Sequence, residues 1–518
     1  MSHRNYDVSI WGVTGYTGRF GAECCFKQNA LRIEKGQTPL RFAFAGRNEP
    51  EMQRIVEGLC AQYPTAPRPD VVTATLEEND MRLEKLCTNT RVLVSYSGPY
   101  SLFGERIVQA CISSSTHYID ITAELTWVQS IAVKYGTEIK EKNLKFVSCC
   151  GFDFLPNDLM MAQLSEVCAS NKIVEAWGGL DALDTVTHTF SQSTPMVSGG
   201  TARSAMEMIR TLGFKNTLRW YLDPFAICNS LPNGSATDKS ILILPRHVGG
   251  NEYCAKYVMS NLMCKYVHWS NELQGYRYGR SLKYYGGESR RNYFWALCCG
   301  ALMWFGFFSV WIGFLLPPQI RSLLLPTVGS GPGTDERSFM FCHLKADFIQ
   351  LTSSETDSPE KSPQFEEARV EDEARVEDES RVEGALGMAV VPQTTGTTTE
   401  ATVDAATMDA EADEDDSKGE TSVSEDTRNH CALKEVRKSG EVVGSVHLKW
   451  RWLGVENYVF AGYASACAGI LLASKPETLP ETYGYLPPSV AFGSPLLKAL
   501  VDAGMQATDA EVREDLME

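Results

Sequence analysis

Short runs of apolar, β-branched and aromatic residues alternate with amphipathic stretches over the first 150 or so residues. The runs predict strands at residues 8–11, 41–45, 70–73, 91–95, 117–120 and 145–148. Helices are predicted between them: a first one that extends through Cys25, then residues 51–61, 83–86, 104–113 and 126–142. This alternation is typical of an α/β fold built on a doubly wound parallel sheet.

A glycine-rich turn joins the first predicted strand to the first helix. Its sequence is Gly12-Val13-Thr14-Gly15-Tyr16-Thr17-Gly18. Backbone amides at such a turn can approach a pyrophosphate, and the positive end of the helix favours the anion. We therefore predict a Rossmann-type NAD(P)-binding domain over residues 1–158, with Gly12, Thr14, Gly15, Tyr16, Thr17 and Gly18 at the cofactor. The alternative is that the glycines only permit a tight turn and close helix packing.

The second predicted strand ends in Gly46-Arg47. The acidic residue that would bind the ribose 2′-hydroxyl of NAD is missing there, and a guanidinium stands in its place. The sequence therefore favours NADP(H) over NAD(H), with Arg47 at the 2′-phosphate. The alternative for Arg47 is a solvated arginine in a loop.

Polar residues follow the later strands, where ligands of such sheets bind. Ser97, Gly98 and Pro99 are expected to contact the cofactor. The catalytic candidates, which could donate or accept a proton, are Tyr100, Asp120, Glu124, Cys150 and Asp153. Other roles are open for them, because Asp120 and Asp153 could cap helices and Cys150 could be a buried apolar residue.

These segments resemble the saccharopine dehydrogenase-like oxidoreductases, whose motifs are close to GATGFTG, AGR, GPY, YxDxxGE and CGFDxxPxD. The resemblance continues at Ser198-Gly199-Gly200-Thr201 and at Asp223-Pro224, although Ala123 replaces the glycine that the family has before Glu124. It implies a second α/β domain for substrate binding or dimerisation, formed by residues 159–351 and 429–518, and a possible homodimer. Residues 172–183, 184–190 and 436–450 are predicted to be rich in strand.

An acidic insertion is predicted to be disordered over residues 352–428, which contain one aromatic residue and a repeat of the type Glu-Ala-Arg-Val-Glu-Asp. This window has 23 acidic and 6 basic residues, so it accounts for the formal charge of −17 of the whole chain. The remainder is formally neutral, which gives no support to nucleic-acid binding. The 16 cysteines form no CxxC motif, so no metal site is predicted, and reduced thiols in a protein facing the cytosol are the simplest explanation.

Residues 293–316 form an uncharged apolar segment that is long enough to cross a bilayer. A single crossing would separate the family-like segments after Gly331 from the sheet that they should join. We therefore predict a monotopic hairpin or a buried amphipathic patch at the cytosolic face of a membrane or lipid droplet. The alternatives are a buried core helix and a dimer interface.

Three functions are consistent with the sequence. The first is a membrane- or lipid-droplet-associated NADP(H)-dependent oxidoreductase that reduces a lipid or lipid-linked intermediate, in lipid or glycolipid metabolism. This choice follows from the apolar segment and from the branch of the resembling family that consists of trans-acting enoyl reductases. The alternatives are a saccharopine-type amino-acid or imine reductase, and a lipid-droplet scaffold that binds cofactor with little turnover.

Overall fold

The computed structural model describes residues 4–192 apart from 78, parts of 203–228, 244–314 apart from 258, 338–351 and 441–514. These residues belong to one compact unit formed by residues 1–352 and 439–518. The predicted disordered insertion lies outside the described residues.

The first sheet has seven parallel strands in the order β13-β6-β5-β4-β1-β2-β3. Six of them come from the N-terminal part of the chain: β1 (Tyr6–Trp11), β2 (Phe42–Gly46), β3 (Asp70–Thr73), β4 (Thr90–Ser95), β5 (His117–Asp120) and β6 (Lys145–Val147). The predicted α/β fold with a Rossmann-type parallel sheet is thereby confirmed. The strand order reverses direction between β1 and β4, which is where sheets of this kind bind their ligands.

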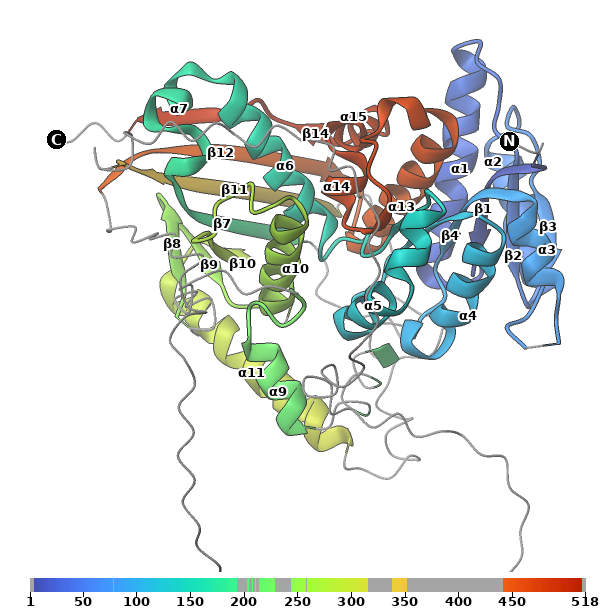
Figure 1. Ribbon diagram of the computed structural model, residues 1–518, viewed down its shortest axis with the longest axis horizontal. Helices are drawn as coiled ribbons and strands as arrows, with labels where there is room; N and C mark the ends of the chain where they lie inside the picture. Colours follow the sequence, from blue (N-terminus) through green and yellow to red (C-terminus); the bar gives the residue numbers. More distant parts are fainter. Residues whose placement is uncertain are drawn as a thin grey trace, which may run out of the picture. The chain divides into compact units, whose positions relative to one another are not determined.

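Helices cover both faces of this sheet (Figure 1). The N-terminal ones are α1 (Tyr16–Glu34), α2 (Glu49–Gln62), α3 (Arg82–Thr88), α4 (Tyr100–Ser113) and α5 (Leu125–Glu141). Because side chains alternate along a strand, each strand feeds two separate cores. Val8 and Ile10 of β1 pack with α1, whereas Leu93 of β4 and Tyr118 of β5 pack with α3, α4 and α5.

The C-terminal part of the chain returns to the first sheet. Helix α13 (Asn457–Ser474) lies against α1 and against strands β1 and β4, and β13 (Gly484–Leu486) adds a parallel strand beside β6. Helices α14 (Pro488–Phe492) and α15 (Ser494–Asp502) follow. The predicted boundaries placed residues 429–518 wholly in the second domain, but α13 and β13 complete the first one.

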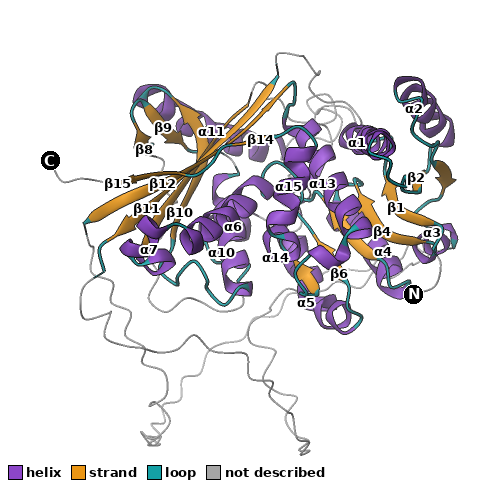
Figure 2. Ribbon diagram, turned by 90° about the horizontal axis from the view of Figure 1, so that it is seen from above, coloured by secondary structure: helices purple, strands orange, loops and turns teal. Residues whose placement is uncertain are grey.

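The second sheet has eight strands and mixes parallel with antiparallel pairs. They are β7 (Leu183–Gln192), β8 (Arg246–Gly249), β9 (Glu252–Ala255), β10 (Lys283–Arg290), β11 (Phe339–Ile349), β12 (Val442–Leu453), β14 (Gln506–Ala507) and β15 (Glu511–Glu514). Figure 2 shows helices α6 (Leu155–Ser170), α7 (Lys172–Trp177) and α10 (Ser260–Leu273) on one side of this sheet, with α11 (Tyr293–Phe314) on the other. The remaining described helix is α9 (Phe214–Leu222).

Strands β11 and β12 pair antiparallel along their whole length, with Ile349 opposite Val442. The acidic insertion therefore connects two neighbouring strands, as expected for a loop within one domain. A long loop of this kind adds little to the free-energy cost of folding, because loop-closure entropy grows only with the logarithm of length.

Two apolar helices bear on the predicted membrane segment. By length and composition, α13 is the one helix among the described residues that could cross a membrane, and 83% of it is buried inside the protein. Helix α11 spans most of the predicted segment and exposes Phe294, Trp295, Leu302 and Phe305. Residues 315–337, which would complete the predicted hairpin, lie outside the described residues.

Candidate functional site

The glycine turn lies where β1 ends and α1 begins. Gly12 has φ +83°, its N–H donates to the carbonyl of Ala45 on β2 at 2.9 Å, and a Cβ there would lie 2.7 Å from Ser97 Oγ. A Cβ at Gly18 would clash with the carbonyl oxygen of Gly12. The turn thus needs glycine at both positions, and it lies directly beside Ser97 of the loop after β4.

The first amides of α1 are available to a ligand. Gly15 is the N-cap and provides no side-chain acceptor, and the first turn of the helix contains no acidic residue. The positive end of a 19-residue helix without a side-chain cap suits a phosphate anion. Thr14 and Tyr16 are partly buried in this turn, and Thr17 is buried at the start of α1.

Arg47 is exposed directly after the end of β2. Within the described part of the chain, no hydrogen bond or ion pair occupies its guanidinium. The next residue, Asn48, caps α2 by accepting the N–H of Glu51 at 3.2 Å. Arg47 therefore presents a free cation beside the glycine turn, since β1 and β2 are neighbouring parallel strands.

The loop after β4 brings the second part of the molecule to the same edge. A Cβ at Gly98 would lie 3.5 Å from Ser204 Oγ and 3.5 Å from the Tyr100 ring. Ser97, Gly98 and Pro99 therefore lie between the glycine turn and the helical segment that contains Ser204.

Tyr100 and Glu124 are engaged in holding the chain. The Tyr100 hydroxyl donates to the carbonyl of Ser95 at 2.9 Å, inside the core. The two carboxylate oxygens of Glu124 accept the N–H groups of Tyr100 (2.8 Å) and Ser101 (3.0 Å) at the start of α4. Both side chains are buried, and their contacts favour a role in fixing the loop after β4.

Asp120 shapes the loop after β6. Its carboxylate accepts the N–H groups of Thr122 (3.0 Å) and Cys149 (3.1 Å) and the hydroxyl of Ser148 (2.8 Å). Cys149 has φ +63°, in the left-handed region that non-glycine residues seldom adopt, and the bond to Asp120 supports this conformation. Burial raises the pKa of Asp120 to about 6.

The Cys150 thiol is fully buried, and burial raises its pKa well above 9. A thiol in this state is a poor nucleophile, because the thiolate is the reactive form. The geometry thus favours packing for Cys150.

Asp153 differs from the other candidates. It follows the Cys149-Cys150-Gly151 bend and is only half-buried. Among the described residues, no hydrogen bond reaches its carboxylate, and burial raises its pKa to about 6. Burial, and next the Asp153 carboxylate, raise the pKa of the neighbouring Tyr257 phenol. Asp153 thus combines access, proximity to a phenol and a pKa near neutrality, which suits a group that transfers protons.

Comparison with known proteins decides the nature of the first domain. Residues 8–147 match the family model described as "Saccharopine dehydrogenase NADP binding domain". The first domain is therefore similar to the NADP-binding domain of saccharopine dehydrogenases. The match includes the glycine turn, Arg47 and the Ser97–Pro99 loop, and it confirms the predicted NADP(H)-binding domain.

Two relatives are similar to this chain over part of their length. A "Trans-acting enoyl reductase" of Mycobacterium leprae is 28% identical over 293 residues, which cover 54% of this chain and 65% of the relative. A "Lipid droplet localized protein" of Caenorhabditis elegans is 29% identical over 154 residues, 30% of this chain and 35% of the relative. The chain thus spans less than two thirds of the length of these relatives. Among solved structures, apo saccharopine dehydrogenase (L-Glu forming) from Saccharomyces cerevisiae aligns over 98% of this chain and 99% of its own, with 10% identity and a TM-score of 0.45.

Three residues near the predicted site residues were not themselves predicted from the sequence. Tyr257 lies near Asp153, and Glu456 and Tyr458 lie against Tyr16 of the turn. They come from segments 100 to 440 residues away from the motifs, so no local pattern points to them. The one available signal is Glu456 as an N-cap before a long apolar helix.

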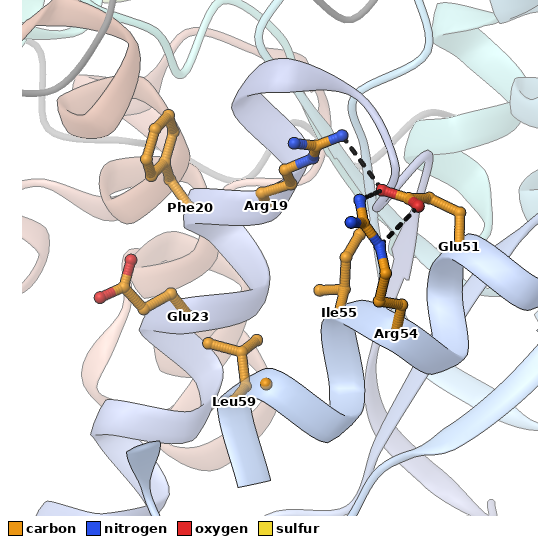
Figure 3. Close-up of a pocket in the computed structure, with 8 residues that line it drawn as sticks. Arg19, Phe20, Glu23, Glu51, Arg54, Ile55 and Leu59 are labelled. Atoms are coloured by element: carbon orange, nitrogen blue, oxygen red, sulfur yellow. Dashed lines mark hydrogen bonds and ion pairs between the residues drawn. The ribbon is translucent and has the colours of Figure 1, made fainter. Parts of the chain in front are cut away.

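A surface pocket of about 320 Å³ opens between α1 and α2, on the outer side of the same domain (Figure 3). Arg19 (3.2 Å) and Arg54 (2.7 Å) both bind the Glu51 carboxylate at its rim, and Phe20, Ile55 and Leu59 line it. Because the arginines are already paired and the predicted catalytic residues lie elsewhere, we do not assign the chemistry to this pocket.

Proposed function

We propose that this protein is an NADP(H)-dependent oxidoreductase that reduces a lipid or lipid-linked substrate at a membrane or lipid-droplet surface. The observation that carries the proposal is the glycine turn with its uncapped helix, set at the ends of two neighbouring strands beside Arg47, which has no partner among the described residues. The turn suits a pyrophosphate, and the guanidinium suits the additional phosphate of NADP.

Different residues of the chain bind the cofactor and transfer the proton. Amides of the Gly12–Gly18 turn hold the pyrophosphate, the Ser97–Pro99 loop borders the cofactor, and Arg47 binds the 2′-phosphate. The reduced nicotinamide supplies a hydride when it is bound. Asp153 would supply the proton to one carbon of an activated C=C bond, the other carbon being the one that takes the hydride. Asp153 is left ionised and regains a proton from solvent, to which its half-buried position gives access.

Lipid chemistry is supported by α11. Phe294, Trp295, Leu302 and Phe305 are 63 to 71% exposed and lie within three helical turns. The spacing of seven residues from Trp295 to Leu302, and of three to Phe305, places them on one side of the helix. Tyr293 at its start packs edge-on against Tyr253 of β9 (5.8 Å), which fixes that end of the helix on the second sheet. An exposed aromatic face of this kind suits a membrane interface. The names of the two relatives also favour lipid chemistry.

A saccharopine-type substrate is less well supported. Its several carboxylates call for free arginines in the second domain. Arg210, one candidate, is already bound to Glu207 at 2.7 Å. A lipid-droplet scaffold remains the alternative if cofactor binds without turnover.

Titration with NADPH and NADH, followed by nicotinamide fluorescence, tests the cofactor. We expect wild-type protein to prefer NADPH and Arg47→Ala to lose that preference, because the 2′-phosphate loses its cation. Arg68→Ala, an exposed arginine bound only to Gln53 among the described residues, is the matched control. Equal affinity of the wild type for both cofactors would contradict the assignment of Arg47.

Substrate class is tested by NADPH oxidation with an α,β-unsaturated acyl thioester, compared with an amino acid plus an aldehyde partner. We expect turnover of the acyl substrate only. Turnover of the imine pair would replace our proposal with the saccharopine type, and binding without turnover of either would favour the scaffold.

Membrane association is tested by flotation with phosphatidylcholine vesicles. The variant with serine at Phe294, Trp295, Leu302 and Phe305 should lose vesicle binding and keep its affinity for NADPH. Serine at Met81 and Val133, both 65% exposed on the first domain, is the control for general loss of surface hydrophobicity. If the α11 variant floats as well as wild type, the membrane assignment is wrong.

A further inference from the structure

Helices α1 and α13 run in the same direction, side by side. Tyr16 lies against Tyr458, Phe20 against Gly462 and Cys24 against Cys467. The contact is close: a Cβ at Gly462 would lie 2.7 Å from Phe20 Cβ and 2.8 Å from the carbonyl oxygen of Thr17. The start of α13 is therefore fixed next to the start of α1, at the glycine turn.

Tyr16, within that turn, is held from the C-terminal helix. Its ring meets Tyr458 edge-on at 5.5 Å and Phe20 at 5.4 Å. Its hydroxyl donates to Glu456 Oε1 at 3.5 Å, a long bond, so the ring contacts carry most of the positioning. Glu456 is 1% exposed and is itself fixed, because Oε2 accepts the N–H of Tyr458 at 3.2 Å.

We infer that Tyr458, with Glu456 behind it, is a positioning residue that sets the Tyr16 side chain over the diphosphate and ribose of the bound cofactor. The inference rests on the proposed NADP(H) site and adds residues 456–458 to it. A tyrosine ring held in one orientation before binding loses less side-chain entropy when the ligand arrives.

This inference predicts a pattern that differs from that of Arg47. NADPH and NADH share the diphosphate and differ only in the 2′-phosphate on the adenosine ribose, so loss of the positioning contact weakens both cofactors equally. Loss of Arg47 weakens NADPH alone.

The test is fluorescence titration of both cofactors with Tyr458→Ala, Tyr458→Phe, Tyr16→Ala and the double alanine variant. We expect Tyr458→Ala to raise the Kd of NADPH and of NADH about tenfold, and Tyr458→Phe to restore both, since the ring is retained. The double variant should bind no more weakly than Tyr16→Ala, because Tyr458 acts through Tyr16.

Tyr463→Ala is the matched control on the same helix. Tyr463 packs on Trp452 at 6.0 Å, further along α13 from the turn. Its loss should lower the Tm and leave both Kd values unchanged. If Tyr458→Ala behaves like Tyr463→Ala, or weakens NADPH alone, the inference is overturned. Failure of the wild type to bind either cofactor would instead overturn the proposed function.

Discussion

Two neighbouring loops at the same edge of the first sheet carry acids that differ in the hydrogen bonds they accept. In the loop after β5, Asp120 and Glu124 each accept two backbone N–H groups. In the loop after β6, Asp153 accepts no hydrogen bond from any residue that the structure describes.

The comparison shows that a shifted pKa does not identify the reactive acid here. Burial raises the pKa of Asp120 and of Asp153 alike, to about 6. The two carboxylates differ in the hydrogen bonds that they accept. A carboxylate surrounded by backbone donors holds the chain in place, whereas one with free oxygens can approach a substrate.

The largest effect should follow from Asp153→Asn. Without the carboxyl proton, kcat should fall by about 10²- to 10⁴-fold, the usual contribution of a general acid. The measurement is NADPH oxidation at saturating substrate, with binding of NADPH retained. Asp502→Asn, at an exposed position of α15, is the control and should be fully active. If the activity of Asp153→Asn were within fivefold of wild type, Asp153 would not be the proton donor and its role would be structural, like that of Asp120 and Glu124.

Glu124→Ala should be next in size and should act on stability. It leaves the buried N–H of Tyr100 and the partly buried N–H of Ser101 without their acceptor, which costs about 1 to 3 kcal/mol in the free energy of unfolding. Urea denaturation measures this loss. Glu124→Gln keeps one acceptor oxygen and should lose less. A loss below about 0.5 kcal/mol for the alanine variant would mean that the bonds to Glu124 contribute little.

A smaller effect with the opposite sign is expected for the stability of Asp153→Asn. Burial raises the pKa of Asp153 from its ordinary value of 3.8 to about 6 in the folded protein, so folding favours the protonated form. Its contribution is complete below about pH 4 and is lost as the pH rises through 6. At pH 8 the asparagine variant should therefore unfold with a free energy about 1 to 3 kcal/mol higher than wild type.

The control for this pH dependence is Asp120→Asn. This substitution also removes an ionisable carboxyl group, but it weakens three hydrogen bonds as well. The variant should therefore be less stable than wild type at pH 5. Denaturation curves at pH 5, 6, 7 and 8 measure both. If the free energy of unfolding of Asp153→Asn changed with pH in parallel with that of wild type over this range, ionisation of Asp153 would not destabilise the folded protein.

Much of the first domain could be predicted because its signals are local. The strands and the glycine turn lie where the apolar runs and glycines place them, and Arg47 follows β2 as expected. Residues 172–183 were predicted to be rich in strand, and this was wrong for α7, where the β-branched Ile173 and Val174 are helical. Asn171 caps that helix by accepting the N–H groups of both residues, and this outweighs their β-propensity.

The roles of individual acids could not be predicted, because they depend on which backbone groups point at them. Nothing in the spacing of Asp120, Glu124 and Asp153 reveals that two are bound by amides and one is not. Similarly, two apolar helices of comparable composition differ in their contacts: α13 is buried against α1, and α11 exposes an aromatic face. Packing partners distant in sequence decide both questions.

The return of α13 to the first sheet has a consequence for synthesis on the ribosome. Its Gly469 lies against Val8, Val92 and Val94 of strands β1 and β4, which are translated hundreds of residues earlier. At 5–20 residues per second, α13 follows β6 by roughly 15 to 65 s. During this interval those valines lack the contact with α13, so we expect nascent chains halted before residue 457 to recruit chaperones. The domain whose first strand is made first is completed only after six of the eight strands of the second sheet, β7 to β12, have been made.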